Sequence, residues 1–262
     1  MNSTHIVILG ILFIFLMTTL GSALVFFFKN EIPEKVNTVF LGFAAGIMIA
    51  ASIWSLLIPA MESSSSWGKW SFVPAVVGFI LGGLFLVLLD KIVPHMHSGT
   101  KEEEGPKVNL QKQTKFFLAV MIHNIPEGLA VGFAFGAAAV VGTSVAYLSA
   151  LGLAIGIGLQ NFPEGAAVAL PMRNACGSRK KSFLYGTLSG IVEPIFAVIG
   201  YFLAAQIEVI QPWLLAFAAG AMIFVVAEDL IPDSKIESHP HLGTWGVMIG
   251  FAVMMILEVV LG

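Results

Sequence analysis

Long apolar stretches dominate this sequence and constrain its fold more than any other feature. Windows of roughly 20 predominantly apolar residues are long enough for an α-helix to cross a bilayer. Eight such windows follow one another, at residues 5–28, 37–60, 71–92, 115–137, 144–171, 182–205, 212–232 and 242–262. Only 11% of the residues are charged, against about 25% in a typical soluble domain. The sequence therefore predicts an all-α integral membrane protein with eight transmembrane helices in a lipid bilayer.

The remaining composition excludes several other classes of protein. A net charge of −3 gives no indication of a nucleic-acid partner. The single cysteine, Cys176, excludes an internal disulfide framework and a Cys-rich structural zinc site. Because the N-terminus has neither a basic region nor a cleavage motif, we interpret residues 5–28 as a retained first span. We expect one transmembrane domain over residues 1–262, with a flexible polar loop at 93–114.

The distribution of Lys and Arg predicts the orientation. With the N-terminus outside the cytoplasm, all 13 Lys and Arg residues except Lys69 fall on cytoplasmic connections. Cytoplasmic loops of membrane proteins carry just such an excess of positive charge. The sequence therefore predicts a multi-pass cell-membrane protein (an inner-membrane protein if the source is bacterial). Both termini would lie outside, and the loop at 93–114 would be cytoplasmic.

Two internal repeats accompany the spans. Residues 123–128 (His-Asn-Ile-Pro-Glu-Gly) on span four return on span five as residues 160–165 (Gln-Asn-Phe-Pro-Glu-Gly). Residues 43–59 on span two resemble residues 217–232 on span seven, and the predicted topology makes these two copies antiparallel. Spans 1–3 and 6–8 are thus predicted to be inverted halves around a central 4–5 pair. Inverted repeats with interrupted helices are typical of secondary transporters.

The repeated motif concentrates polar side chains at membrane depth, where ionisable groups are costly and usually functional. His123 and Glu127 are predicted to lie about 40° apart on one helix face. Asn124 lies in the same arc, and the second copy repeats the pattern. Because Pro126 and Pro163 each leave a helical carbonyl without its usual donor, we expect these positions to line a wet cavity.

Span six adds Glu193, which Pro194 follows. Three carboxylates, one imidazole and three side-chain amides suit a divalent ion of borderline hardness such as Zn²⁺. The sequence predicts an intramembrane metal site, and two ions bridged by Glu127 and Glu164 are one arrangement of it. A polar cluster that only braces the helices is the alternative for the charged residues. The amides could instead hold the carboxylates in place, and Glu193 could cap a helix break.

These motifs resemble the ZIP (Zrt/Irt-like) divalent-metal transporters, and the Gln-Asn-x-Pro-Glu-Gly copy resembles their bacterial GufA-type branch. The resemblance covers the whole chain and implies zinc uptake into the cytoplasm through a binuclear site, with Fe²⁺, Cd²⁺ or Mn²⁺ as further substrates. It implies an elevator-like motion of spans 1, 4, 5 and 6 against the others, and a homodimer. By position, the implied ligands are His123, Asn124, Glu127, Gln160, Asn161, Glu164, Glu193 and Met48. Many eukaryotic members have histidine in place of Gln160, which leaves the preferred metal open.

Other interpretations stay open beside this one. From the sequence alone, Met48 is a core residue, because methionine usually fills gaps. Glu228 and Asp229 on span seven are a candidate exit route or ordinary interfacial charges. The histidines at 95 and 97, near Asp90, favour a solvated loop over a metal-collecting one. The alternative function is an intramembrane zinc enzyme, but the chain lacks a His-Glu-x-x-His motif. We expect no enzyme activity and no catalytic cofactor.

Overall fold

The structure is a computed structural model that describes residues 3–28, 32–96, 105–234 and 239–261. Across these ranges the regular secondary structure is helical and contains no strand. Eight helices or helix runs are long and apolar enough to cross a membrane. The prediction of an all-α membrane protein with eight spans is therefore confirmed.

Most spans consist of one long helix, and three combine shorter pieces. The single helices are α1 (Ser3–Ala23), α4 (Phe72–Ile92), α5 (Lys112–Val141), α6 (Ser144–Cys176) and α11 (Pro240–Leu261). The second span combines α2 (Glu34–Ala51), η2 (Ser52–Leu57) and α3 (Ile58–Ser63), and the sixth combines α7 (Arg179–Ser189) with α8 (Val192–Gln206). The seventh contains η4 (Glu208–Ile210), α9 (Gln211–Val225), η5 (Val226–Leu230) and α10 (Ile231–Asp233). Short 3₁₀ turns, η1 (Leu24–Phe26) and η3 (Ser65–Trp70), follow α1 and α3.

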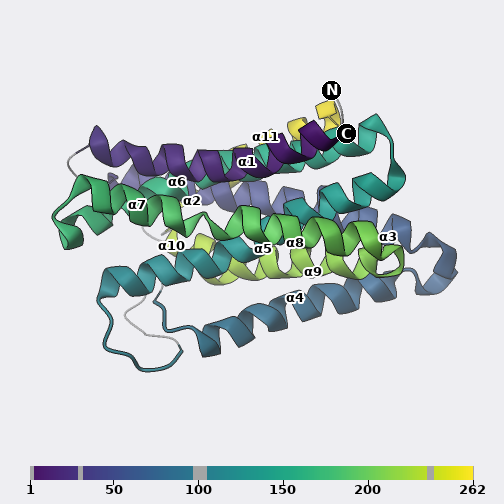
Figure 1. The fold of residues 1–262 in the computed structure, drawn as a ribbon, viewed down its shortest axis with the longest axis horizontal. Helices are drawn as coiled ribbons and strands as arrows, with labels where there is room; N and C mark the ends of the chain where they lie inside the picture. The colour runs from purple at the N-terminus through teal and green to yellow at the C-terminus, as the bar shows by residue number, and fades with distance from the viewer. Residues whose placement is uncertain (1–2, 29–31, 97–104, 235–238, 262) are drawn as a thin grey trace.

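The spans lie side by side as one bundle, with the start of α1 and the end of α11 at the same end (Figure 1). In the second, fourth, fifth and seventh spans, more than half of the central residues are buried. The third and eighth spans bury only 28% and 17% of theirs. Since these outer spans are as apolar as the inner ones, their exposed faces suit contact with lipid. The polar motifs of α5 and α6 therefore lie in the interior of the bundle.

The helices pack most extensively in four pairs, namely α1 with α6, α5 with α8, α2 with α11 and α4 with α9. Each pair contains a glycine that allows backbone contact. A Cβ added at Gly46, Gly82, Gly128 or Gly165 would lie 2.1, 2.0, 2.4 or 2.1 Å from a backbone oxygen of the partner helix. Small residues at such crossings allow helices to approach closely in membranes. The pairs α2–α11 and α4–α9 are those that an inverted repeat would relate, although the repeat itself stays a prediction.

The helix breaks differ from those expected. Helices α5 and α6 run through Pro126 and Pro163 without interruption. The interruption lies on span six instead, between the end of α7 and the start of α8. The two copies of the second repeat each contain a π-helical segment, η2 and η5, directly before the turn that contains Pro59 or Pro232. A wider π turn before the proline accommodates its ring and the loss of the hydrogen bond that its missing N–H cannot make.

The connection after α4 is shorter and more ordered at its ends than expected. Helix α5 begins at Lys112, three residues before the predicted span, and His95 and Met96 are buried. The preference for a solvated loop is therefore wrong at His95, whose ring is buried beside Asp90 at the end of α4. Residues 97–104 lie outside the described residues, so the expected flexibility of that part stays a prediction.

Candidate metal centre

Five of the predicted ligands form one hydrogen-bonded cluster where α5, α6 and α8 meet. Glu127 Oε1 accepts a hydrogen bond of 2.5 Å from Gln160 Nε2, which also donates to Asn161 Oδ1 at 2.9 Å. Asn161 Nδ2 donates to Glu193 Oε2 at 2.6 Å. Asn124 Nδ2 donates to Glu193 Oε1 at 3.1 Å and to a backbone carbonyl of α7 at 3.0 Å. No side chain of the five is more than 1% exposed, so the bundle interior encloses the cluster.

Local features of the chain explain why these side chains meet. The break between α7 and α8 places Glu193 in the first turn of α8, where the helix dipole favours a carboxylate. Gly128 has no side chain to separate α5 from α8, and a Cβ there would lie 2.4 Å from the Glu193 carbonyl oxygen. The backbone of α8 thus reaches the turn of α5 that contains Asn124 and Glu127.

Three oxygens of the cluster are buried without a hydrogen-bond partner, namely Glu127 Oε2, Asn124 Oδ1 and Gln160 Oε1. A buried acceptor left unpaired costs about 1–3 kcal/mol. Carboxylate and amide oxygens are ligands for divalent cations, so a bound cation would complete their interactions. These unpaired oxygens fit the metal role that the sequence predicts.

The other two polar members of the repeated motif lie apart from the cluster. His123 and Glu164 are half-buried and line a cavity of about 500 Å³ between α2, α5, α6 and span seven. Glu164 lies one helical turn after Gln160 and Asn161 on α6, on the side of the helix that the i+3 and i+4 spacing shares with them. The structure therefore divides the predicted ligands between a closed cluster and an adjoining open cavity.

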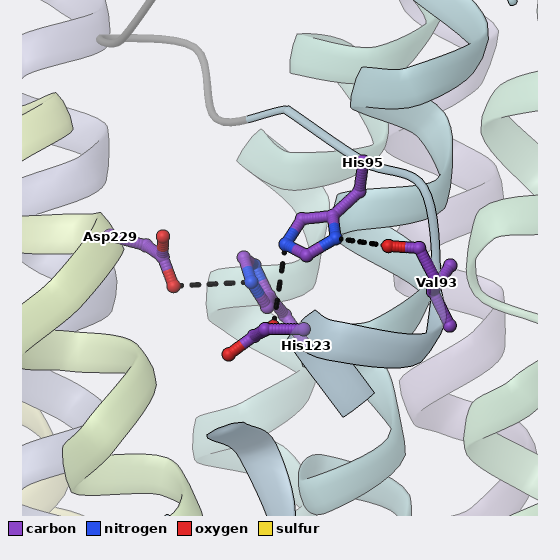
Figure 2. A network of polar contacts seen from close by, with 5 residues as sticks. Val93, His95, His123 and Asp229 are labelled. Carbon is purple, nitrogen blue, oxygen red and sulfur yellow. Dashed lines mark hydrogen bonds and ion pairs between the residues drawn. The ribbon is translucent and has the colours of Figure 1, made fainter. Parts of the chain in front are cut away.

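Across the cavity, His123 contacts span seven. His123 Nε2 lies 3.1 Å from Asp229 Oδ2, and the two side chains point toward each other from α5 and η5 (Figure 2). Asp229 is 5% exposed, whereas its neighbour Glu228 is exposed. Of the two candidate exit residues, only Asp229 is a member of the cavity wall. The same view contains His95, whose Nδ1 lies 2.8 Å from the Val93 carbonyl and whose Nε2 lies 3.3 Å from Asp90.

Met48 lies in a different environment. Its side chain is fully buried in the main hydrophobic core together with Met222, its counterpart in the second repeat. It is absent from the cavity wall. This placement agrees with the core interpretation of Met48, while its role as a soft metal ligand stays a prediction.

One residue outside the sequence motifs contacts the cluster. Thr18 of α1 donates from Oγ1 to Glu193 Oε1 at 3.1 Å. The signal available in the sequence is a pair of hydroxyl residues, Thr18 and Ser22, that recurs at i and i+4 within an apolar span. Such residues commonly bond within their own helix, so the spacing alone did not connect them with the metal motif.

The arrangement limits how a metal ion could bind. In the described ranges, no three His, Cys, Asp or Glu side chains are grouped so that they could hold a metal ion. In this conformation an ion would therefore need amide oxygens as ligands or a movement of the carboxylates. The amide nitrogens that face Glu127 and Glu193 occupy directions in which a cation would otherwise approach.

Comparison with known proteins identifies the family. The sequence profile of the ZIP zinc transporter family matches residues 4–116 and 112–258. The chain is 37% identical to zinc transporter ZIP11 of Homo sapiens over 100% of its length and 98% of that protein. It is 36% identical to zinc transporter GufA of Myxococcus xanthus, with 89% and 90% of the two chains covered. Zinc transporter ZupT of Clostridium perfringens is 33% identical, with 98% and 96% covered. The chain is therefore a multi-pass membrane protein that belongs to the ZIP zinc transporter family.

Proposed function

We propose that this protein carries zinc ions across the membrane into the cytoplasm through the site formed by α5, α6 and α8. The observation that carries the proposal is the set of three buried, unpaired oxygens on Asn124, Glu127 and Gln160. They adjoin the cavity that His123 and Glu164 line. The names of the relatives support zinc as the substrate, and Fe²⁺, Cd²⁺ and Mn²⁺ are proposed as further substrates.

We further propose that the site holds two ions. The first would bind His123, Glu127, Gln160 and Glu164 at the edge of the cavity. The second would bind Asn124, Asn161 and Glu193 deeper in the cluster, with Glu127 and Glu164 shared between the ions. Met48 is proposed as a soft ligand whose side chain leaves the hydrophobic core and contacts an ion when the helices move. Glu164 lies one helical turn after Gln160 and Asn161 on α6, next to both proposed ions, which supports a shared role.

The position of the cavity supports the direction of transport. Its wall includes Glu34, Lys112 and Asp233, at the end of the bundle where α5 begins. The predicted topology places every Lys and Arg except Lys69 at this end, and positive residues face the cytoplasm. The conformation would therefore be open to the cytoplasm. Asp229 would accept the ion from His123 as the ion leaves the site toward the cytoplasm.

The packing of the helices supports a motion that carries the site. The cluster residues come only from α1, α5, α6 and α8, which form one body, while α2, α4, α9 and α11 form the other. Within each body, glycines bring helix backbones together, as described above. Between the bodies, α6 meets α11 without such a close backbone contact: a Cβ at Gly152 would lie no closer than 3.5 Å, and one at Gly156 would meet the flexible side chain of Met254, with Sδ at 2.5 Å. The main cavity and a smaller one of about 290 Å³ lie between the bodies at opposite ends. An elevator-like displacement of the first body would open one cavity and close the other.

Two further parts of the proposal rest on the family. We propose that the protein works as a homodimer, which the resemblance implies. We also propose that it is a transporter without enzyme activity, in agreement with the transporter names of its relatives.

The test is uptake of radioactive zinc into proteoliposomes by the wild type and Glu164→Ala, with unlabelled Fe²⁺, Mn²⁺ and Cd²⁺ as competitors. We expect saturable uptake that the substitution abolishes, because Glu164 is the one of the three motif glutamates that lines the cavity. Exposed Glu208, on a connection remote from the cavity wall, provides the matched control Glu208→Ala. Wild-type protein that moves no zinc, or a Glu164→Ala variant with unchanged uptake, would refute the proposal.

A further inference from the structure

We propose that Thr18 is a positioning residue that holds the Glu193 carboxylate in place while a metal ion is bound. This inference rests on the proposed function, because it assigns a role within the same site. Thr18 lies on α1, outside the repeated motifs, and belongs to neither predicted ligand set. Its hydroxyl is nevertheless the sole group of α1 with a described hydrogen bond to the cluster.

Thr18 is fixed in position from two directions. Its side chain is 1% exposed, and its Oγ1 lies 3.1 Å from Glu193 Oε1 and 3.3 Å from the Ile14 carbonyl oxygen of its own helix. A Cβ added at Gly165 would lie 2.1 Å from the Thr18 carbonyl oxygen, and one added at Gly190 would lie 2.8 Å from Thr18 Cγ2. Helix α6 and the break after α7 therefore press against the backbone and the side chain of Thr18 and hold its hydroxyl oxygen beside Glu193. The single hydroxyl proton is shared between Glu193 Oε1 and the Ile14 carbonyl oxygen, with Glu193 the nearer acceptor.

The three donors to Glu193 differ in what metal binding would require of them. Asn124 and Asn161 donate from their amide nitrogens. Asn124 Oδ1 is unpaired and could bind an ion without turning. Asn161 Oδ1 already accepts from Gln160 Nε2, so binding an ion there would rearrange the amide that now donates to Glu193. The Thr18 hydroxyl has no such second role. It is the donor that stays with Glu193 in both the empty and the loaded state.

This difference predicts which state depends on Thr18. In the empty protein, loss of the hydroxyl leaves two amide donors on Glu193. In the loaded protein, with the Asn161 amide rearranged, it leaves the buried carboxylate with fewer donors beside the ion, and such a group is more costly. Removing the hydroxyl should therefore weaken metal binding without a comparable loss of stability in the metal-free protein.

The chain offers a matched control at the next residue. Thr19 makes its described hydrogen bond within its own helix, from Oγ1 to the Phe15 carbonyl oxygen at 2.9 Å. Thr18→Val and Thr19→Val remove one hydroxyl each from the same helix with almost no change in volume. Thr18→Ser keeps the hydroxyl at the cluster, and Thr18→Ala removes it in a smaller side chain.

The experiment combines zinc uptake into proteoliposomes with thermal unfolding in detergent, with and without zinc. We expect Thr18→Val to raise the KM for zinc about tenfold, the size typical for a hydrogen bond to a charged group, with Vmax within about twofold. The zinc-induced rise in Tm should shrink, whereas the zinc-free Tm should match that of Thr19→Val. Thr18→Ser should restore wild-type values. If the valine variant does not fold, Thr18→Ala against Thr18→Ser makes the same comparison.

The outcomes separate this inference from the proposed function. Wild-type uptake together with equal KM values for the Thr18 and Thr19 variants would refute the inference alone. A lower zinc-free Tm with an unchanged zinc-induced rise would also refute it, because Thr18 would then only support packing. If zinc does not stabilise the wild type and the wild type does not transport zinc, the proposed function and this inference are both refuted.

Discussion

Replacing Glu127 by glutamine should separate metal binding from folding. The substitution keeps the shape of the side chain, and the amide oxygen can replace Oε1 as the acceptor for Gln160 Nε2, a bond of 2.5 Å. The amide nitrogen then replaces Oε2, which is buried without a hydrogen-bond partner. The metal-free protein therefore loses no hydrogen bond, while the site loses one of its three carboxylates.

The two effects have different expected sizes. A buried ionised carboxylate with an unpaired oxygen is more costly than a neutral amide, so the metal-free Tm of Glu127→Gln should equal or exceed that of the wild type. Zinc should stabilise only the wild type. At a free zinc concentration of 100 times Kd, a bound ion contributes about 2.7 kcal/mol to the free energy of unfolding. The variant should lack this contribution and show no zinc uptake.

The assay is thermal unfolding in detergent across a buffered range of free zinc, paired with uptake of radioactive zinc. Glu208→Gln is the control, because Glu208 is an exposed acid on η4 and should behave as the wild type in both assays. A zinc-induced rise in Tm that persists in Glu127→Gln would show that Glu127 does not bind the ion. A metal-free Tm well below that of the wild type would refute the reasoning from the unpaired oxygen.

Two further predictions concern packing and orientation. Gly165→Ala should lower the free energy of unfolding by about 1–3 kcal/mol, because its Cβ would lie 2.1 Å from the Thr18 carbonyl oxygen. Gly152→Ala on the same helix has its nearest neighbours at 3.5 Å and should be tolerated. Equal melting temperatures for Gly165→Ala and Gly152→Ala would contradict the packing argument. An epitope tag after residue 262 should react with antibody on intact cells. A tag reached only after permeabilisation would reverse the orientation.

The eight spans were predictable because hydropathy is a local property of the sequence. Each apolar window became a helix or helix run, with ends shifted by a few residues. The meeting of Asn124, Glu127, Gln160, Asn161 and Glu193 also followed from the residues. Buried polar groups in an apolar bundle stay satisfied mainly by contacting one another, so several such groups at membrane depth converge.

Features that depend on packing between distant helices were not predictable. His123 and Glu127 share a helix face by spacing, yet His123 lies in the cavity wall and Glu127 in the cluster. What separates them is the position of span seven, whose Asp229 contacts His123. The burial of His95 likewise depends on how the segment after α4 packs, and no local sequence pattern predicts that burial.

The prolines show how a local rule can point to the wrong place. Pro126 and Pro163 each remove a backbone donor, but both are buried in the bundle, and α5 and α6 continue through them. The helix break lies before Glu193, and the π segments lie before Pro59 and Pro232. Breaks in buried helices thus occur where packing leaves room for them, and proline only marks the candidates.

The side-chain amides offer a physical account of how the carboxylates of Glu127 and Glu193 can share one cluster before any ion arrives. An amide presents N–H donors from one end and an oxygen acceptor from the other. In the present conformation, Gln160 and Asn161 turn their nitrogens to Glu127 and Glu193 and occupy the directions from which a cation would approach. Rotation about the terminal side-chain bond would turn the oxygen to the ion instead. A neutral imidazole has only one N–H and could not replace both donors of Gln160, which bonds Glu127 and Asn161 at once. We therefore expect the amide at residue 160 to favour a stable empty site, and so the release of the ion, over the tightest binding of zinc.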